Sequence, residues 1–300
     1  MSKPEEASDP LSKSESGWER NPYEQNEPIA AAAPPIKIGA EIRNELIDQI
    51  IKTYELRSED IAETVELFYD CQKLRIMHAN KKGSEPSSPM VQWLGKWLET
   101  GEKVIHGKLK EWIESEQSPS ESRWAYAQAG IGPVLASGLA AHIDVTKADS
   151  ISSLWRFAGQ DPTADRKVKG TKSPYNGRLK TLCWKIGESF VKVSGRESAF
   201  YGHWYAKFKS DEVSRNENGL YSAQAQRELA NKKIKDAPTK AKLQSGKLTD
   251  GHLHARAKRR AVKLFLAHYW TEGRKARNLP VRAPYSIAIL KHDAMIEPPV

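Results

Sequence analysis

The chain has 300 residues, with 47 Lys and Arg against 38 Asp and Glu, and a formal net charge of +9. Its 39% hydrophobic and 28% charged residues are typical of a soluble protein with a sizeable core. No apolar run approaches the ~18 residues of a membrane-spanning helix, and no secretory signal is recognisable, so we expect no membrane partner. The only two cysteines, Cys71 and Cys183, lack metal-ligand spacing and predict a cytoplasmic location.

Charge is distributed unevenly along the chain. Residues 1–150 carry 17 Lys and Arg against 25 Asp and Glu, whereas residues 151–300 carry 30 against 13. A half with a net charge of +17 repels itself unless it meets a polyanion, and the commonest cytoplasmic polyanion is nucleic acid. The alternative is a basic surface that serves solubility alone.

The first third of the chain divides into a tail and a helical hairpin. Residues 1–35 are rich in Ser, Glu, Pro and Asn and are predicted to be a disordered tail. Residues 36–117 are predicted to form two long amphipathic helices, over 41–77 and 91–113, joined by a Pro/Ser loop. This antiparallel, coiled-coil-like hairpin would be either an intramolecular packing element or an arm through which residues 41–113 form a homodimer.

The remainder, residues 118–300, is expected to be a second helical domain, so the predicted fold class is all-α. Several shorter helices are expected over 150–210, a polar stretch with a helix at 223–235 over 213–250, and a last helix over about 251–275. The aromatic run Phe200–Tyr205 and the scattered tryptophans are interpreted as core residues. No alternating β pattern longer than about four residues and no repeat is found.

Residues 124–143 predict a helix–hairpin–helix, a motif that binds the DNA backbone without reading sequence. A Gly-x-Gly-Pro turn joins two short helices, and its glycines permit positive φ and a close approach of the backbone to a phosphate. Pro133 suits the first turn of the second helix, whose free N–H groups would face the phosphate. Small residues such as Gly138 would let the two helices pack tightly. The alternative is a tight helical corner within the core.

Two further basic segments are expected to contact DNA. The loop 166–180 holds six basic residues and no acid, and Tyr175 offers a stacking face. The last helix presents a basic face with the run 256–260. His252 and His254 lack further Cys, His or Asp partners, so we predict no metal site and no cofactor. The predicted DNA-binding residues are Gly130, Gly132, Pro133, Val134, Arg166, Lys167, Lys169, Lys172, Arg178, Lys180, Arg256, Lys258, Arg259 and Arg260.

Several of these segments together resemble the C-terminal domain of insertion-sequence 110/116/902-type transposases. The matching segments are the Gly-Ile-Gly-Pro hairpin in 129–142, the Gly-x-x-Pro segment in 153–162, the basic loop and helix start in 172–180, and the helix and tail in 252–285. The resemblance extends over roughly residues 90–295 and implies a function in DNA transposition or recombination.

The resemblance also implies which family parts this chain has and which it lacks. Residues 1–40 cannot form the family's RuvC-like nuclease domain, so Mg²⁺ is expected only if a separate RuvC-like subunit exists. The family's nucleophilic serine follows Gly-x-x-Pro, but no serine follows Pro162 directly, and Ser173 matches a different family serine. The leading hypothesis is a transposase-derived DNA-binding protein, with a structured guide RNA as a further partner. The alternatives are an active recombinase subunit that uses Ser173 or a partner chain, and a regulatory protein of a mobile element.

Overall fold

A computed structural model describes Gln49 and residues 53–80, 88–162, 169–231, 234–282 and 296–299. All regular secondary structure in these ranges is helical, which confirms the predicted all-α class. The expected tail 1–35 lies outside the described residues. Residues 54–300 form one compact unit, so the boundary expected near residue 117 falls inside it.

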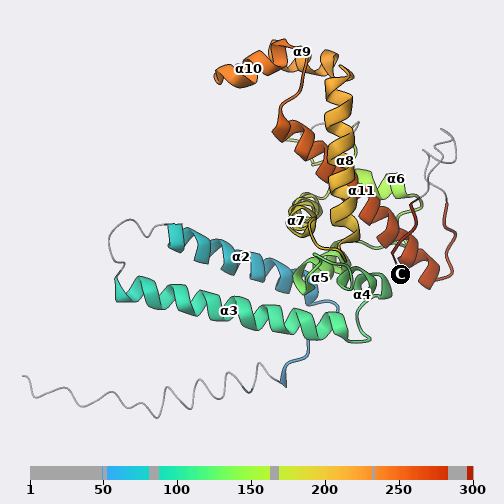
Figure 1. Ribbon diagram of the computed structural model, residues 1–300. Coiled ribbons are helices and arrows are strands. Elements are labelled where there is room, and N and C mark those ends of the chain that lie inside the picture. Colours follow the sequence, from blue (N-terminus) through green and yellow to red (C-terminus); the bar gives the residue numbers. More distant parts are fainter. Residues whose placement is uncertain are drawn as a thin grey trace, which may run out of the picture. The chain divides into compact units, whose positions relative to one another are not determined.

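Helices α2 (Ile61–Asn80) and α3 (Pro89–Glu114) form the expected helical pair (Figure 1). The helix expected over 41–77 is wrong over 54–60, which is not helical, and α2 begins only at Ile61, directly after Asp60, whose carboxylate accepts a hydrogen bond from the Arg57 backbone N–H. Ser88 caps α3 by accepting from the Val91 N–H. Midway along the pair the Arg75 guanidinium donates to Glu102, which joins the two helices.

Helix α5 (Pro133–His142) lies at the centre of the unit. It packs against α2, α3, α4 (Ser120–Tyr126) and α7 (Gly177–Val193). Its small residues allow this close packing, and Ala136, Gly138 and Leu139 are all buried. The base of the α2–α3 pair is therefore anchored in the core, as an intramolecular packing element would be.

Helix α11 (Asp250–Ala276) organises the rest of the core. It contacts α4, α6 (Ile151–Phe157), α7 and α8 (Phe200–Glu217). The prediction of a core role for Phe200–Tyr205 is confirmed at Tyr201 and Tyr205, which are buried. Tyr201 forms a hydrogen bond of 2.7 Å with Nδ1 of His268 on α11. The last helix thus closes a core that earlier helices begin.

A second, smaller apolar cluster lies where α9 (Ser222–Asn231) and α10 (Ala237–Gln244) meet the start of α11. The helix expected at 223–235 within the polar stretch 213–250 corresponds to α9, but the stretch holds more helix than predicted, because α8 continues to Glu217 and α10 fills 237–244. Asp236 caps α10 by accepting from the Thr239 N–H, and buried Leu243 supplies its one apolar anchor. A short polar helix with a single apolar anchor has too little periodicity to be recognised from sequence.

Residues 296–299 pack on the core at α4 and α11. The backbone carbonyl of Ile296 lies 2.7 Å from Nε2 of the buried His268, and the Trp124 indole N–H donates to the carbonyl of Pro299. Because a carbonyl can only accept, Nε2 carries the proton and Nδ1 accepts from Tyr201 when the ring is neutral. Among the described residues, no helix is both long enough and apolar enough to cross a membrane.

Candidate nucleic-acid interface

The hairpin predicted over 124–143 consists of α4, a turn at 127–132 and α5. Pro133 occupies the first turn of α5, as expected, but Pro133 and Val134 are both buried. Gly132 is exposed, with φ −82° and ψ 173°, and no atom lies within 4 Å of where its Cβ would be. Positive φ is therefore not the reason for glycine at 132, and only its exposed backbone could meet a ligand.

Gly130 is the residue of this turn that needs glycine. It has φ +95°, and its carbonyl accepts a hydrogen bond from the Ser189 hydroxyl of α7. Gly138 also faces α7, where a Cβ would lie 3.0 Å from the Leu182 methyl groups. The prediction is that Gly138 lets α4 and α5 pack tightly. It is wrong about which helix Gly138 contacts, because the close approach at Gly138 is between α5 and α7. The turn is thus held as a corner against α7.

The basic loop is described only in part, since Arg166 and Lys167 lie outside the described residues. Lys169 and Lys172 are exposed. The Lys180 ammonium lies 3.9 Å from the centroid of the Tyr175 ring, so these two side chains stack as a cation–π pair. The Ser173 hydroxyl oxygen is buried and has no hydrogen-bond partner among the described residues. The loop leads into the N-terminus of α7, which Asn176 caps.

A groove of about 1760 Å³ separates α2 from the N-terminal half of α7, with His142 of α5 in its lining. The groove brings together residues more than 90 positions apart in sequence, because α2 and α7 both pack on α5. Its basic lining residues are Lys73, Arg178, Lys180 and Lys185, and its acidic ones are Glu66 and Asp70. Ser173 also lines this groove.

Only one of the four basic groups in the groove is paired with an acid among the described residues. Arg178 approaches Glu66 to 2.5 Å. The Lys185 ammonium lies 3.3 Å from the centroid of the Tyr69 ring, and burial lowers the pKa of Lys185. Burial also raises the pKa of Tyr69 to about 12 and lowers the pKa of His142. The groove therefore holds a neutral phenol and imidazole beside cations that a phosphate could neutralise.

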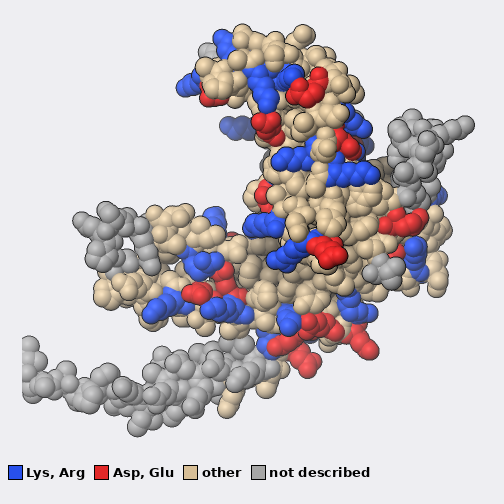
Figure 2. All heavy atoms as spheres, in the orientation of Figure 1, with Lys and Arg blue, Asp and Glu red and all other residues tan. Residues whose placement is uncertain are grey.

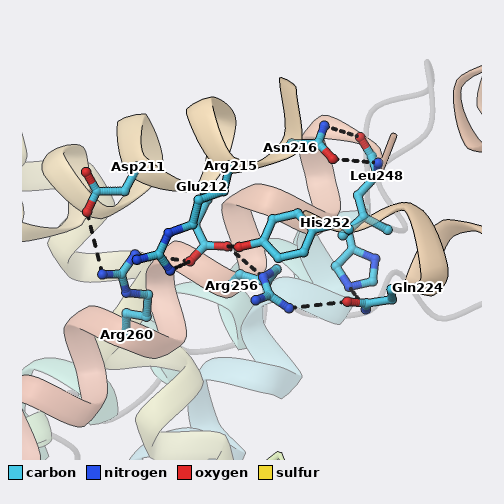
Figure 3. A network of polar contacts seen from close by, with 10 residues as sticks. Asp211, Glu212, Arg215, Asn216, Gln224, Leu248, His252, Arg256 and Arg260 are labelled. Atoms are coloured by element: carbon cyan, nitrogen blue, oxygen red, sulfur yellow. Dashed lines mark hydrogen bonds and ion pairs between the residues drawn. The ribbon is translucent and has the colours of Figure 1, made fainter. Parts of the chain in front are cut away.

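The basic run of α11 is largely engaged within the protein. Glu212 of α8 is 1% exposed, and it accepts from Arg256 at 2.7 Å, from Arg260 at 3.1 Å and from the Tyr221 hydroxyl at 2.6 Å (Figure 3). Burial acts to raise the pKa of Glu212, but these hydrogen bonds and the arginine charges outweigh it and hold the pKa below the ordinary value. Arg256 and Arg260 thus join α8 to α11.

The other two basic residues of this run, Lys258 and Arg259, differ from each other in whether they have an acid partner. Lys258 donates to Glu188 of α7, so it joins α11 to α7. Arg259 is exposed, and it forms no ion pair with any described residue. Desolvation, and then repulsion from Arg256, lower its pKa. Of the four basic residues predicted at 256–260, Arg259 alone is a cation without an acid partner in the described part of the chain.

The two histidines at the start of α11 face different partners. His252 contacts Glu228 and Gln224, whereas Nδ1 of His254 forms a hydrogen bond of 2.7 Å with the Tyr205 hydroxyl. No group of three or more His, Cys, Asp or Glu side chains that could hold a metal occurs among the described residues.

The sequence reasoning missed three residues at this surface. Lys73 and Lys185 line the groove, and Trp184 of α7 is 61% exposed, so the expectation that the tryptophans lie in the core is wrong there and at Trp93 and Trp97. In Figure 2, basic side chains lie around α7 and along α8 and α11, whereas acidic ones gather near the end of α3. The sequence does carry a signal for Lys185, because Arg178, Thr181 and Lys185 are spaced by three and four residues and therefore lie on one face of α7.

Comparison of the chain with protein-family models, with curated proteins and with solved structures gives no match. The resemblance to transposases consequently rests on the residues alone, and it stays a prediction.

Proposed function

We propose that this protein binds DNA through the sugar–phosphate backbone, at the groove between α2 and α7 and at the loop that enters it. The observation that carries the proposal is a set of cations without acid partners among the described residues: Lys73, Lys169, Lys172, Lys180 and Lys185. Ammonium groups that lack internal carboxylates are available to phosphates, and they gain by releasing counterions from DNA.

This proposal places the centre of the interface at α7, rather than at the hairpin of 124–143 or at the basic run of α11. Arg256, Lys258 and Arg260 would each have to break an internal ion pair before they could bind a phosphate. Lys180 and Lys185 have no ion pair to break among the described residues. Each of them contacts an aromatic ring instead. Exposed Arg259 and the Gly132 backbone remain as additional contacts in the proposal.

The test measures binding of a labelled duplex by fluorescence anisotropy at 50 and 200 mM salt. Six or more phosphate contacts imply about a thousandfold loss of affinity over this range. The double variant Lys180→Gln/Lys185→Gln should reduce the slope of log affinity against log salt concentration by the amount expected for about two lost phosphate contacts. The matched control is Lys103→Gln, since Lys103 is an exposed lysine of α3 that pairs with Glu99. A salt-independent affinity, or equal effects of the two changes, would contradict the proposal.

Two further partners belong to this proposal. A structured guide RNA would meet the same cations, and competition between RNA and duplex for the protein would reveal it. A homodimer through residues 41–113 would use the far half of α3, where Met90, Trp93 and Trp97 are exposed. A sedimentation measurement on the parent and on Trp97→Glu tests the dimer. The free thiols Cys71 and Cys183 agree with a cytoplasmic location.

The second candidate function is an active recombinase subunit, and the observation that favours it is the position of Ser173. Its hydroxyl is buried and has no partner among the described residues, and Ser173 belongs to the lining of the groove that also holds Arg178 and His142. Attack of this oxygen on a DNA phosphorus would form a serine–phosphate bond and release a deoxyribose hydroxyl. The serine proton would pass to a base such as neutral His142, and the leaving deoxyribose oxygen would take a proton from the imidazolium so formed or from water.

An assay for covalent adducts separates the two functions. Labelled supercoiled and junction DNA are incubated with the protein and Mg²⁺, and nicks and protein–DNA adducts are measured. We expect neither, because a RuvC-like partner would have to supply any metal-dependent step. An adduct that disappears in Ser173→Ala would establish the recombinase. Junction binding without adducts would leave a binding module, and competition for transposon ends would then test a regulatory role.

A further inference from the structure

An aromatic side chain stands exposed on the helix that carries the unpaired lysines. Trp184 is 61% exposed, although its neighbours Leu182, Cys183 and Ile186 on α7 are all buried. α7 therefore has a well-defined buried face, and Trp184 lies off it. An indole in water contributes nothing to the core, so its ring is available to a ligand.

Lysines surround this indole. Lys180 lies one helical turn before Trp184, about 6 Å along the axis, and the Lys258 ammonium lies 5.8 Å from the centroid of the indole ring. Lys180 also stacks on Tyr175, so the loop before α7 and the N-terminal half of α7 together present an aromatic ring, a lysine and a second aromatic ring in sequence. Because Lys258 is paired with Glu188, the uncompensated charge of this row is that of Lys180.

The row continues the groove. Thr181, three residues before Trp184 and on the adjoining side of the helix, lines the groove together with Lys180. A strand of nucleic acid bound along the groove lysines would pass over Trp184 as it leaves. At that point the protein offers a flat π-face instead of another cation.

From this arrangement we infer that Trp184 is the stacking platform for an unpaired nucleobase, with Lys180 binding the adjoining phosphate. Bases within a duplex are already stacked on each other, so only an unpaired base presents a free face to the indole. Stacking on an indole tolerates any base, because every base has a π-face. The inference rests on the proposed function and adds a preference for unpaired nucleotides at one position.

The experiment compares a fluorescein-labelled oligothymidylate of about 16 nucleotides, within the reach of one binding module, with a duplex of equal length. Parent, Trp184→Ala, Trp184→Phe and the control Leu220→Ala are titrated by anisotropy at 100 mM salt, roughly physiological in screening. Leu220 is the matched control because it is a large apolar side chain of similar exposure, at 64%, and lies between α8 and α9, outside the groove and the proposed dimer surface. Thermal melts of each variant verify folding.

We expect Trp184→Ala to weaken single-strand binding about tenfold while duplex affinity changes less than about twofold, since one stacked base supports a loss of this size. Trp184→Phe should retain most of the affinity, and Leu220→Ala all of it. Single-strand binding by Trp184→Ala at parental affinity, or an equal loss on both probes, would overturn the inference. Parental protein that binds neither probe would instead overturn the proposed function.

Discussion

The substitution Glu212→Gln tests whether the arginines of α11 serve the fold. The change keeps the size of the side chain and its hydrogen bond from Tyr221, but it removes the negative charge that faces Arg256 and Arg260. Removing one partner of a buried ion pair costs about 3–5 kcal/mol. The two arginine side chains are 30% and 31% exposed, so water compensates in part. We therefore expect a loss of about 2–3 kcal/mol in the free energy of unfolding.

In a unit of this size such a loss lowers the melting temperature by about 5–10 °C, measured by circular dichroism or calorimetry. The matched control is Asp211→Asn. The Asp211 carboxylate is 40% exposed and meets Arg260 at 3.5 Å, an ion pair of about 0–1 kcal/mol. Equal melting temperatures for the two variants would refute the structural role of the Glu212 network.

The same variant makes a prediction about pH. Because the folded pKa of Glu212 lies below its ordinary value, its contribution to stability is present above the ordinary carboxyl pKa. The contribution disappears as the pH falls through the folded pKa. The acid limb of the stability curve should therefore be shallower in Glu212→Gln than in the parent. Duplex affinity should not fall, because the freed arginines remain cationic.

Two further predictions concern packing and histidine protonation. Gly138→Ala should destabilise the protein by about 1–3 kcal/mol, because its Cβ would lie 3.0 Å from the Leu182 methyl groups. Gly132 has open space around it, so Gly132→Val should lower the free energy of unfolding by less than about 1 kcal/mol, which thermal melts would check. The same change should weaken duplex binding if the hairpin backbone meets a phosphate, and unchanged anisotropy titrations would contradict this. Desolvation lowers the pKa of His142 and His268, so the free energy of unfolding should fall as the pH drops from about 7 to 5, and urea melts at several pH values would contradict this if they were superimposable.

The fold class was predictable because long helices repeat their apolar residues at helical spacing. The body of α2, the whole of α3 and the bounds of α11 follow from that periodicity, whereas the start of α2 at Ile61 does not. The short polar α10 has one apolar anchor, Leu243, and was missed for lack of a pattern. Local pattern thus predicts an element only where enough of its residues face the core.

The candidate site was predictable only in part, because it depends on contacts between distant segments. Lys172 and Lys180 belong to a local run of cations and were found from sequence. The groove that they enter needs α2, and nothing local to Lys73 links it to α7. The internal ion pairs of the basic run of α11 could not be predicted for the converse reason, since its acid partner Glu212 lies 44 residues before Arg256.

The late position of α11 in the chain has a consequence for biosynthesis. Three hydrogen bonds join α11 to residues 122–155, across separations of 108, 147 and 122 positions in sequence. They are formed by Trp155 with Lys263, by Ser122 with Tyr269 and by Trp270 with Ala148. Until residues 250–276 leave the ribosome, the apolar faces of α4, α5 and α7 have no α11 to cover them. A helical protein with such distant contacts should fold slowly and only after most of its synthesis, so chaperones would meet it as an unfinished core. Stalled or truncated chains that lack α11 should accordingly be degraded or aggregate instead of accumulating as folded fragments.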